Sequence, residues 1–151
     1  MTRKQIREFI REGVDLMTPS IEFGSGRLSE FASIRSHKYP AVWMLLGVVS
    51  GTNPSPGAPS DQWEIELIIA QKDQPDSPAE LYEQIIDLSD EIAQKLMYKY
   101  NQIVTTNNLT YKLVTLANRK RTPFVKDYSP DCITGVKLTF TMTVPDRTNV
   151  C

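Results

Sequence analysis

The sequence predicts an α+β fold, in which a mostly antiparallel sheet carries two helices packed on one face, in the order α-β-β-β-α-β-β. Two amphipathic segments, each with a single apolar stripe, predict the helices. Apolar or alternating runs before and after the second segment predict the strands. A helix with one apolar side suits a layer that covers one face of a sheet, so both helices are expected on the same face.

The composition predicts one soluble domain over residues 1–151. A hydrophobic content of 40% can form a core, and 17 basic against 18 acidic side chains leave a formal charge of −1. This near-balance argues against a dedicated nucleic-acid binder, although a local basic patch stays open. No signal peptide is evident, and the longest apolar run, residues 41–49, is too short for a membrane helix of about 20 residues. Cys132 and Cys151 are too few for a disulfide framework, so two reduced thiols in a protein made inside a cell are expected.

The first helix is expected over residues 1–17. Thr2 and Gln5 form a capping box, and Pro19 follows the end of the helix. Gly13 weakens the helix slightly. The apolar face consists of Ile6, Phe9, Ile10, Val14 and Met17. We expect this face to dock on the domain's own sheet, with a neighbouring subunit as the alternative.

The segment over residues 20–39 is the least regular part of the sequence. Ile21 and Phe23 alternate as in a strand, residues 24–26 have the composition of a turn, and residues 28–34 could return as a second strand. What this segment contacts stays open.

Two strands with a long loop between them are expected next. Residues 41–49 are apolar on both faces, which is typical of a central strand. Residues 50–61 are rich in proline and glycine and predict an extended loop, long for a hairpin and so suited to contacting a partner. Residues 62–72 alternate as a strand with one apolar face. That face consists of Trp63, Ile65, Leu67 and Ile69.

The main helix is expected over residues 77–103. Ser77 can cap it, Pro78 fits its first position, and Glu80 can complete a capping box. The predicted buried stripe consists of Leu81, Ile85, Leu88, Ile92, Leu96 and Ile103. Truncation of Leu88 or Ile92 to alanine is therefore expected to cost about 2–5 kcal/mol.

The C-terminal part predicts two more strands. The first covers residues 109–117, a basic tip follows at residues 118–121, and residues 122–127 are extended. The last strand, over residues 132–144, is the clearest of all because its apolar and polar residues alternate. Its inward residues are Val136, Leu138, Phe140, Met142 and Val144, and its outward residues are Lys137, Thr139, Thr141 and Thr143.

The sequence shows no catalytic, metal-binding or cofactor-binding motif, so no enzyme activity, metal or cofactor is expected. His37 is the only histidine, and with the two cysteines it has no zinc-site spacing. Glu64 and Glu66 are the most enzyme-like pair, since paired carboxylates can hold magnesium or act as acid and base. Glutamates that alternate on the outer face of a strand are more often its solvated side.

The distribution of charge suggests a subunit interface. The main helix is acidic in its first half and basic at Lys95 and Lys99, which matches the helix dipole and stabilises the helix locally. The acidic face could instead meet a basic patch on the next copy of the chain. The acidic residues of this interface are Glu80, Glu83, Asp87 and Asp90, and the basic residues are Arg119, Lys120, Arg121 and Lys126. The same basic residues could face DNA in the lumen of a ring, contacting phosphates without reading bases.

With these elements in order, the chain resembles the neck and tail-terminator ring proteins of tailed bacteriophages. The resemblance lies in the amphipathic first helix, in the long helix between two groups of strands, and in the turn at Pro130 with Gly135 before an alternating strand. It covers most of residues 2–144 and rests on pattern, not on a signature motif.

The resemblance implies a structural protein of the virion, assembled in the host cytoplasm into a ring of six or twelve copies. The ring would bind neighbouring neck, portal or tail-tube proteins and leave a channel for DNA, with no membrane and no cofactor involved. Three alternatives stay open: another head–tail connector or tail-completion component, a small α+β enzyme that uses Glu64 and Glu66, and a non-viral binding module.

Overall fold

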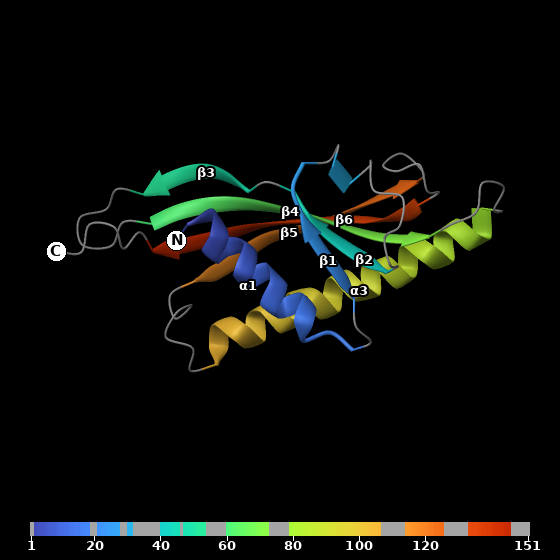
Figure 1. The fold of residues 1–151 in the computed structure, drawn as a ribbon, viewed down its shortest axis with the longest axis horizontal. Helices are drawn as coiled ribbons and strands as arrows, with labels where there is room; N and C mark the ends of the chain where they lie inside the picture. Colours follow the sequence, from blue (N-terminus) through green and yellow to red (C-terminus); the bar gives the residue numbers. More distant parts are fainter. Residues whose placement is uncertain are drawn as a thin grey trace.

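The computed structural model confirms the predicted fold class. It describes residues 2–18, 21–27, 30–31, 40–45, 47–53, 60–72, 79–106, 114–125 and 133–145. One six-stranded, mostly antiparallel sheet carries two long helices (Figure 1). The elements are α1 (Arg3–Asp15), β1 (Glu22–Ser25), β2 (Ala41–Met44), β3 (Val48–Asn53), β4 (Ser60–Lys72), α3 (Ala79–Thr105), β5 (Thr115–Val125) and β6 (Ile133–Pro145).

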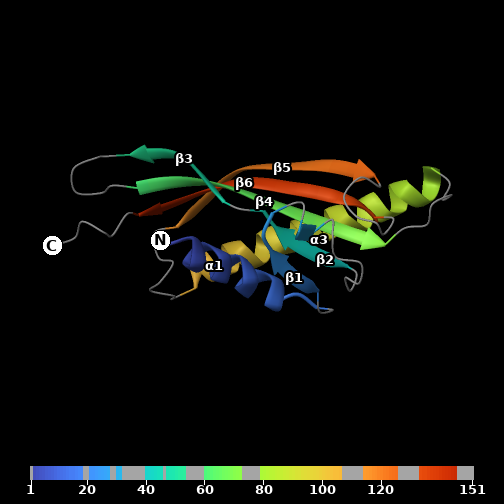
Figure 2. The ribbon, with the colours of Figure 1, turned by 45° about the horizontal axis from the view of Figure 1, so that its top comes forward.

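The sheet has the strand order β1-β2-β4-β6-β5, and only the β1–β2 pair is parallel. Its centre is the long β4–β6 pair, which runs in unbroken register from Ser60 opposite Pro145 to Lys72 opposite Ile133. Both helices lie on the same side of the sheet, as Figure 2 shows. The inward faces of β4 and β6 are the ones that the alternation predicted, and they form the main core with α1 and α3.

Helix α1 forms as predicted at its start. The Gln5 amide donates to the Thr2 hydroxyl over 3.3 Å, and the Thr2 amide donates to the Gln5 side-chain oxygen over 2.8 Å. This capping box satisfies amides that otherwise lack an intrahelical partner. The apolar face predicted for the helix is buried in the main core, so the helix docks on its own sheet. The helix ends at Asp15, slightly earlier than expected.

The strand expected over residues 41–49 and the loop expected over residues 50–61 need correction. Residues 41–53 pair with β4 in two pieces, β2 and β3, with register shifts between Met44 and Val48 and between Val49 and Gly51. Strand β3 extends to Asn53 and β4 begins at Ser60, so both ends of the expected loop are strand. The turn signals located the hairpin correctly but predicted too long a loop, because strand pairing tolerates bulges and continues into the segment. Residues 54–59 lie outside the described part.

The outer face of the sheet also carries a small apolar cluster. Glu30 and Phe31 are helical, and their amides donate to the carbonyl of Arg27, so a strand does not return here as expected. Phe31 is fully buried against Trp43, with ring centroids 5.5 Å apart. The buried members of the cluster are Phe31, Trp43, Ile68, Ala70, Phe124 and Ile133. Phe31 therefore packs on the face opposite the two long helices, whereas Ile21 and Phe23 pack against the main core.

Helix α3 buries part of the expected stripe: Ile85, Leu96 and Ile103 are in the core as predicted. Leu88 is 52% exposed, so its assignment to the core is wrong, and Ile92 is only partly buried. The buried positions are Ile85, Ser89, Ala93, Leu96, Met97, Tyr100 and Ile103. Ser89 can be buried because its hydroxyl donates to the Ile85 carbonyl over 2.9 Å. The expected cap at Ser77 and Pro78 lies outside the described residues.

Candidate functional site

The basic residues 119–121 lie inside strand β5, not at a loop tip as the sequence suggested. The pairing of β5 with β6 shifts between Ala117 and Lys120, which marks a β-bulge. Asn118 occupies the left-handed region at φ 56, a conformation that asparagine tolerates better than most residues. Its side-chain amide donates to the Thr141 hydroxyl over 3.4 Å.

Because side chains alternate along β5, its basic residues are divided between the two faces of the sheet, and the bulge decides which face each one takes. Arg119 and Arg121 line a groove of about 400 Å³ between α3 and β5. The other residues of this groove are Ala93, Gln94, Met97, Tyr98, Asn101 and Leu138. Lys120 instead lines a hollow of about 270 Å³ on the outer face of the sheet, together with Glu64 and Glu66. A single basic patch, as the sequence suggested, is therefore not formed.

One of the expected intermolecular ion pairs forms within the chain. The Arg121 guanidinium lies 3.6 Å from the Asp90 carboxylate, with 40% and 32% of the two side chains exposed. Arg119 and Lys120 have no ion pair within the described part of the chain. Of the basic residues 119–121, these two are therefore the candidates for a contact with a neighbouring molecule.

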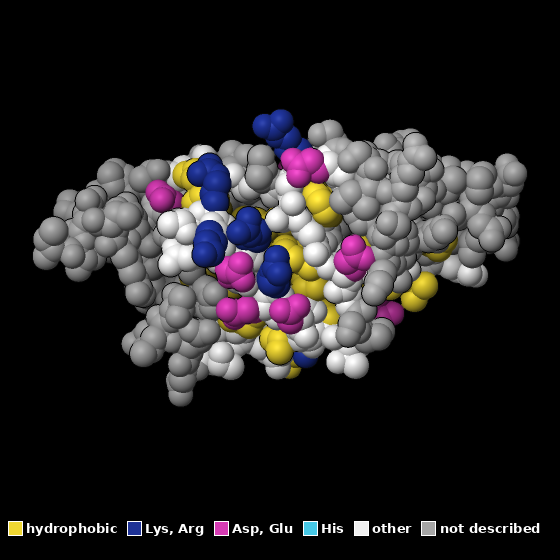
Figure 3. Space-filling model, viewed as in Figure 1, with side chains coloured by type: hydrophobic (Ala, Val, Ile, Leu, Met, Phe, Trp, Pro, Cys, Tyr) yellow, Lys and Arg dark blue, Asp and Glu magenta, His cyan; other side chains and the backbone are white. Residues whose placement is uncertain are grey.

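The acidic side of the candidate interface lies along α3. Glu83 and Asp87 are exposed, and neither has an ion pair among the described residues. At 1.5 Å of rise per residue, Asp87 lies about one turn before Asp90 on the flank of α3 that faces β5. The side chains of Glu80 and Lys126 fall outside the described residues. Figure 3 shows basic and acidic side chains interspersed among the described residues of the face that carries α1.

Glu64 and Glu66, the pair considered for an enzyme, lie on the open outer face of the sheet. The Lys137 ammonium is 3.4 Å from the Glu66 carboxylate across the β4–β6 pair. Glu64 stands opposite Thr141. This arrangement is a cross-strand ion pair on a solvated sheet face, which stabilises a sheet by about 0.2–1 kcal/mol.

The described residues contain no group of three or more His, Cys, Asp or Glu side chains placed to hold a metal ion. His37, Cys132 and Cys151 lie outside the described part. Within that part, neither helix has the length and apolar character needed to cross a bilayer.

A pocket of about 130 Å³, which no sequence pattern indicated, lies beside the start of α1. Arg3, Arg7 and Trp63 line it, together with backbone around Gly26 and Gly47. The Arg3 guanidinium stands 5.2 Å from the centre of the Trp63 ring, a cation–π contact. The pocket joins a helix, a turn and a strand bulge, so no local spacing in the sequence could have revealed it.

A second feature that the sequence reasoning missed is the apolar surface of α3. Leu88 and Tyr98 are 52% and 61% exposed, the highest values among the large hydrophobic residues described. Both belong to a run of exposed positions with alternating spacings of four and three. The spacing can be read from the sequence, but the exposure of these positions cannot.

Comparison with known proteins identifies no family for the chain, because no protein-family model and no curated protein matches it.

Proposed function

We propose that the chain is a structural virion protein of a tailed bacteriophage that assembles into a ring in the neck or at the end of the tail. The observation that carries this proposal is the order of elements: an amphipathic α1, a long α3 between two groups of strands, and a final alternating β6. This order is the basis of the resemblance to neck and tail-terminator proteins. The ring would join head to tail or end tail-tube growth, and would leave a channel for DNA.

Opposite charges on α3 and β5 would supply a contact between copies. Glu83 and Asp87 of one copy would meet Arg119 of the next, a heterologous contact that makes a ring when its rotation closes. Lys120 lies on the other face of the sheet and takes no part in this contact. Arg121 takes no direct part, because it is paired with Asp90. The contact would be weakened by salt, since exposed charges are screened.

Electron microscopy of the purified protein in negative stain at high concentration tests the proposal. We expect closed rings or short stacked tubes, with a symmetry that gives the number of copies. The same grids prepared with purified portal or tail-tube protein test whether closure needs a template. Particles of the size of one or two chains under both conditions would contradict the ring.

Charge reversal then tests the contact. The variant Arg119→Glu is expected to reduce ring formation while leaving the thermal unfolding temperature within a few degrees of the wild type. Lys4→Glu, an exposed cation on α1 outside the proposed contact, is the matched control. Normal rings from the Arg119→Glu variant would show that the contact uses other residues.

A further inference from the structure

The exposed side of α3 carries regularly spaced residues whose pattern neither the core nor the proposed ring contact explains. Six residues recur at alternating spacings of four and three, and all six are exposed. They are Gln84, Leu88, Glu91, Lys95, Tyr98 and Gln102. This is the spacing that keeps side chains on one seam of a helix, as in a pair of coiled helices. We call these six residues the outer stripe.

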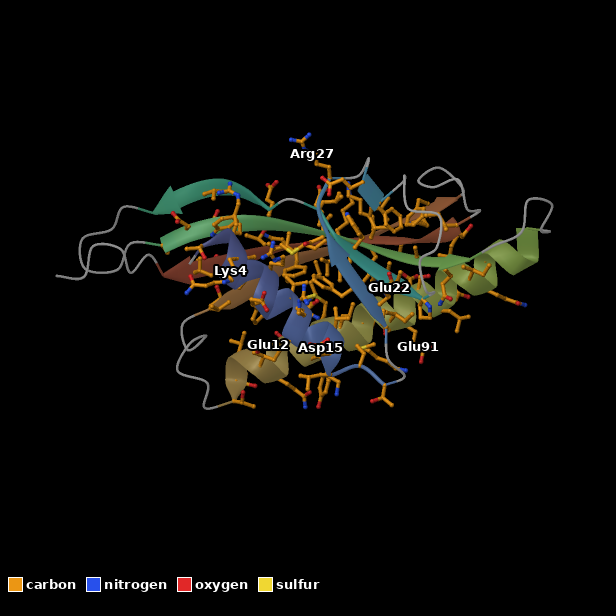
Figure 4. The ribbon with its side chains drawn as sticks, viewed as in Figure 1. Lys4, Glu12, Asp15, Glu22, Arg27 and Glu91 are labelled. Atoms are coloured by element: carbon orange, nitrogen blue, oxygen red, sulfur yellow. The ribbon has the colours of Figure 1, made fainter. Side chains whose placement is uncertain are left out.

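The outer stripe is self-complementary: residues at equal distances before and after Ala93 are alike or opposite in charge. Gln84 and Gln102 lie equally far from the centre, as do the exposed apolar residues Leu88 and Tyr98. Glu91 and Lys95 lie on either side of it with opposite charges, and their side chains are 57% and 55% exposed. Figure 4 shows Glu91 on α3, pointing away from the sheet.

We propose that the outer stripe binds a second copy of this chain, with the two α3 helices antiparallel about a twofold axis near Ala93. Leu88 then packs on Tyr98 of the partner subunit, and Glu91 pairs with Lys95 of the partner subunit. Each contact is made twice, as in any isologous interface. The complementary charges fix the antiparallel direction, since a parallel pair would place Glu91 against its own copy.

Local stabilisation of α3 accounts for only part of this surface. Glu91 and Lys95 already form an ion pair within the helix, 2.9 Å apart, which stabilises an isolated helix by about 0.2–0.5 kcal/mol. That pair needs no apolar neighbours, yet Leu88 and Tyr98 stand on either side of it with more than half of their surface in water. A second copy removes both from water.

The apolar surface continues from Tyr98 of the stripe to the end of α1. Leu16 is 49% exposed and lines a groove of about 390 Å³ with Tyr98, between the end of α1 and α3. In the antiparallel arrangement this groove lies beside Leu88 of the partner subunit. The two ends of the interface therefore each gain an apolar contact in addition to the stripe itself.

This dimer does not rest on the proposed virion role, because it uses the outer stripe and not Arg119. An isologous pair stops at two copies, whereas a ring contact continues until it closes. Sedimentation velocity separates the two, since the first gives a dimer and the second a larger assembly.

The charge pair gives the first test. Glu91→Lys and Lys95→Glu each place two like charges on every stripe, so each variant alone is expected to lose the dimer that the wild type forms. An equimolar mixture should recover the dimer, because both cross-chain pairs are then opposite in sign. Neither variant retains an intrachain pair, so recovery cannot come from helix stability. A monomeric wild type, or a mixture no more associated than its components, would overturn the proposal.

The apolar contact and the direction give the second test. Leu88→Ala is expected to weaken the dimer about tenfold, or about 1.4 kcal/mol, while Val49→Ala, an exposed apolar residue on β3, leaves it unchanged. With Cys132→Ser and Cys151→Ser as background, Gln84→Cys mixed with Gln102→Cys should form a cross-linked dimer on oxidation, and Gln84→Cys alone should not. Equal weakening by both alanine variants, or cross-linking of Gln84→Cys with itself, would show that the arrangement is wrong.

Discussion

The ring of Tyr100 on α3 lies directly against Gly13 on α1, so closely that a Cβ atom at residue 13 would overlap the ring. The Tyr100 hydroxyl donates to the Ile10 carbonyl over 3.2 Å, and its ring stacks on Phe9 with centroids 5.4 Å apart. Tyr100 also contacts Phe140 on β6, with centroids 5.8 Å apart. One buried side chain therefore joins both helices to the centre of the sheet.

The first prediction concerns Gly13. Gly13→Ala should destabilise the fold by about 1–3 kcal/mol through overpacking, although alanine favours a helix by up to about 1 kcal/mol. Urea unfolding measures the change. Lys4→Ala, exposed on the same helix, should change the free energy of unfolding by less than about 0.5 kcal/mol. A more stable Gly13→Ala protein would mean that α1 and α3 do not approach this closely.

The second prediction concerns Tyr100 and pH. Burial raises the pKa of the Tyr100 phenol far above its ordinary value of about 10. Ionisation of Tyr100 therefore does not change the free energy of unfolding below about pH 10. Above it, the unfolded chain loses the proton and the folded chain keeps it, so stability falls as pH rises, by up to about 1.4 kcal/mol per pH unit.

The variant Tyr100→Phe isolates this effect. It should be less stable at neutral pH by about 0.5–1.5 kcal/mol, because the hydrogen bond to Ile10 is lost. Above about pH 10 the difference should shrink or reverse, since phenylalanine does not ionise. Urea unfolding over this pH range measures both effects, with Tyr98→Phe at an exposed position as the control. A difference that stays constant with pH would contradict the prediction.

The third prediction compares two leucines of α3. Leu96 is fully buried, and Leu96→Ala should cost about 2–5 kcal/mol. Leu88 is 52% exposed, so Leu88→Ala should cost less than about 1 kcal/mol in a monomer, in place of the larger loss that the sequence led us to expect. Thermal unfolding at low protein concentration compares the two. Equal losses would place Leu88 in the core after all.

The fourth prediction concerns Asp90 and Arg121. Their ion pair is well exposed, so a double-mutant cycle with Asp90→Asn and Arg121→Gln should give a coupling energy of only about 0.2–1 kcal/mol. The coupling should decrease as salt is added. A coupling of zero at low salt would mean that Arg121 is free to contact a neighbouring copy with Arg119.

Local chemistry in the sequence determined much of the fold. The capping box at Thr2 and Gln5 fixed the start of α1, because its hydrogen bonds join residues only three positions apart. The alternation along β4 and β6 identified their inward faces, since side chains of a strand point alternately to its two sides. One helix before the strands and one between two groups of them also followed from periodicity.

Tertiary structure decided which side of α3 is buried and where the basic residues point. The sequence favoured the large aliphatic residues, but α3 packs through Ser89, Ala93 and Tyr100, where a small or specifically bonded side chain lets the helix approach its neighbours. Strand alternation separates Lys120 from Arg119 and Arg121, and the bulge at Asn118 decided which face each of them takes, because one extra residue reverses the face of every residue after it. The buried side of α3 and the face that each cation takes depend on neighbours distant in sequence, so no local pattern predicts them.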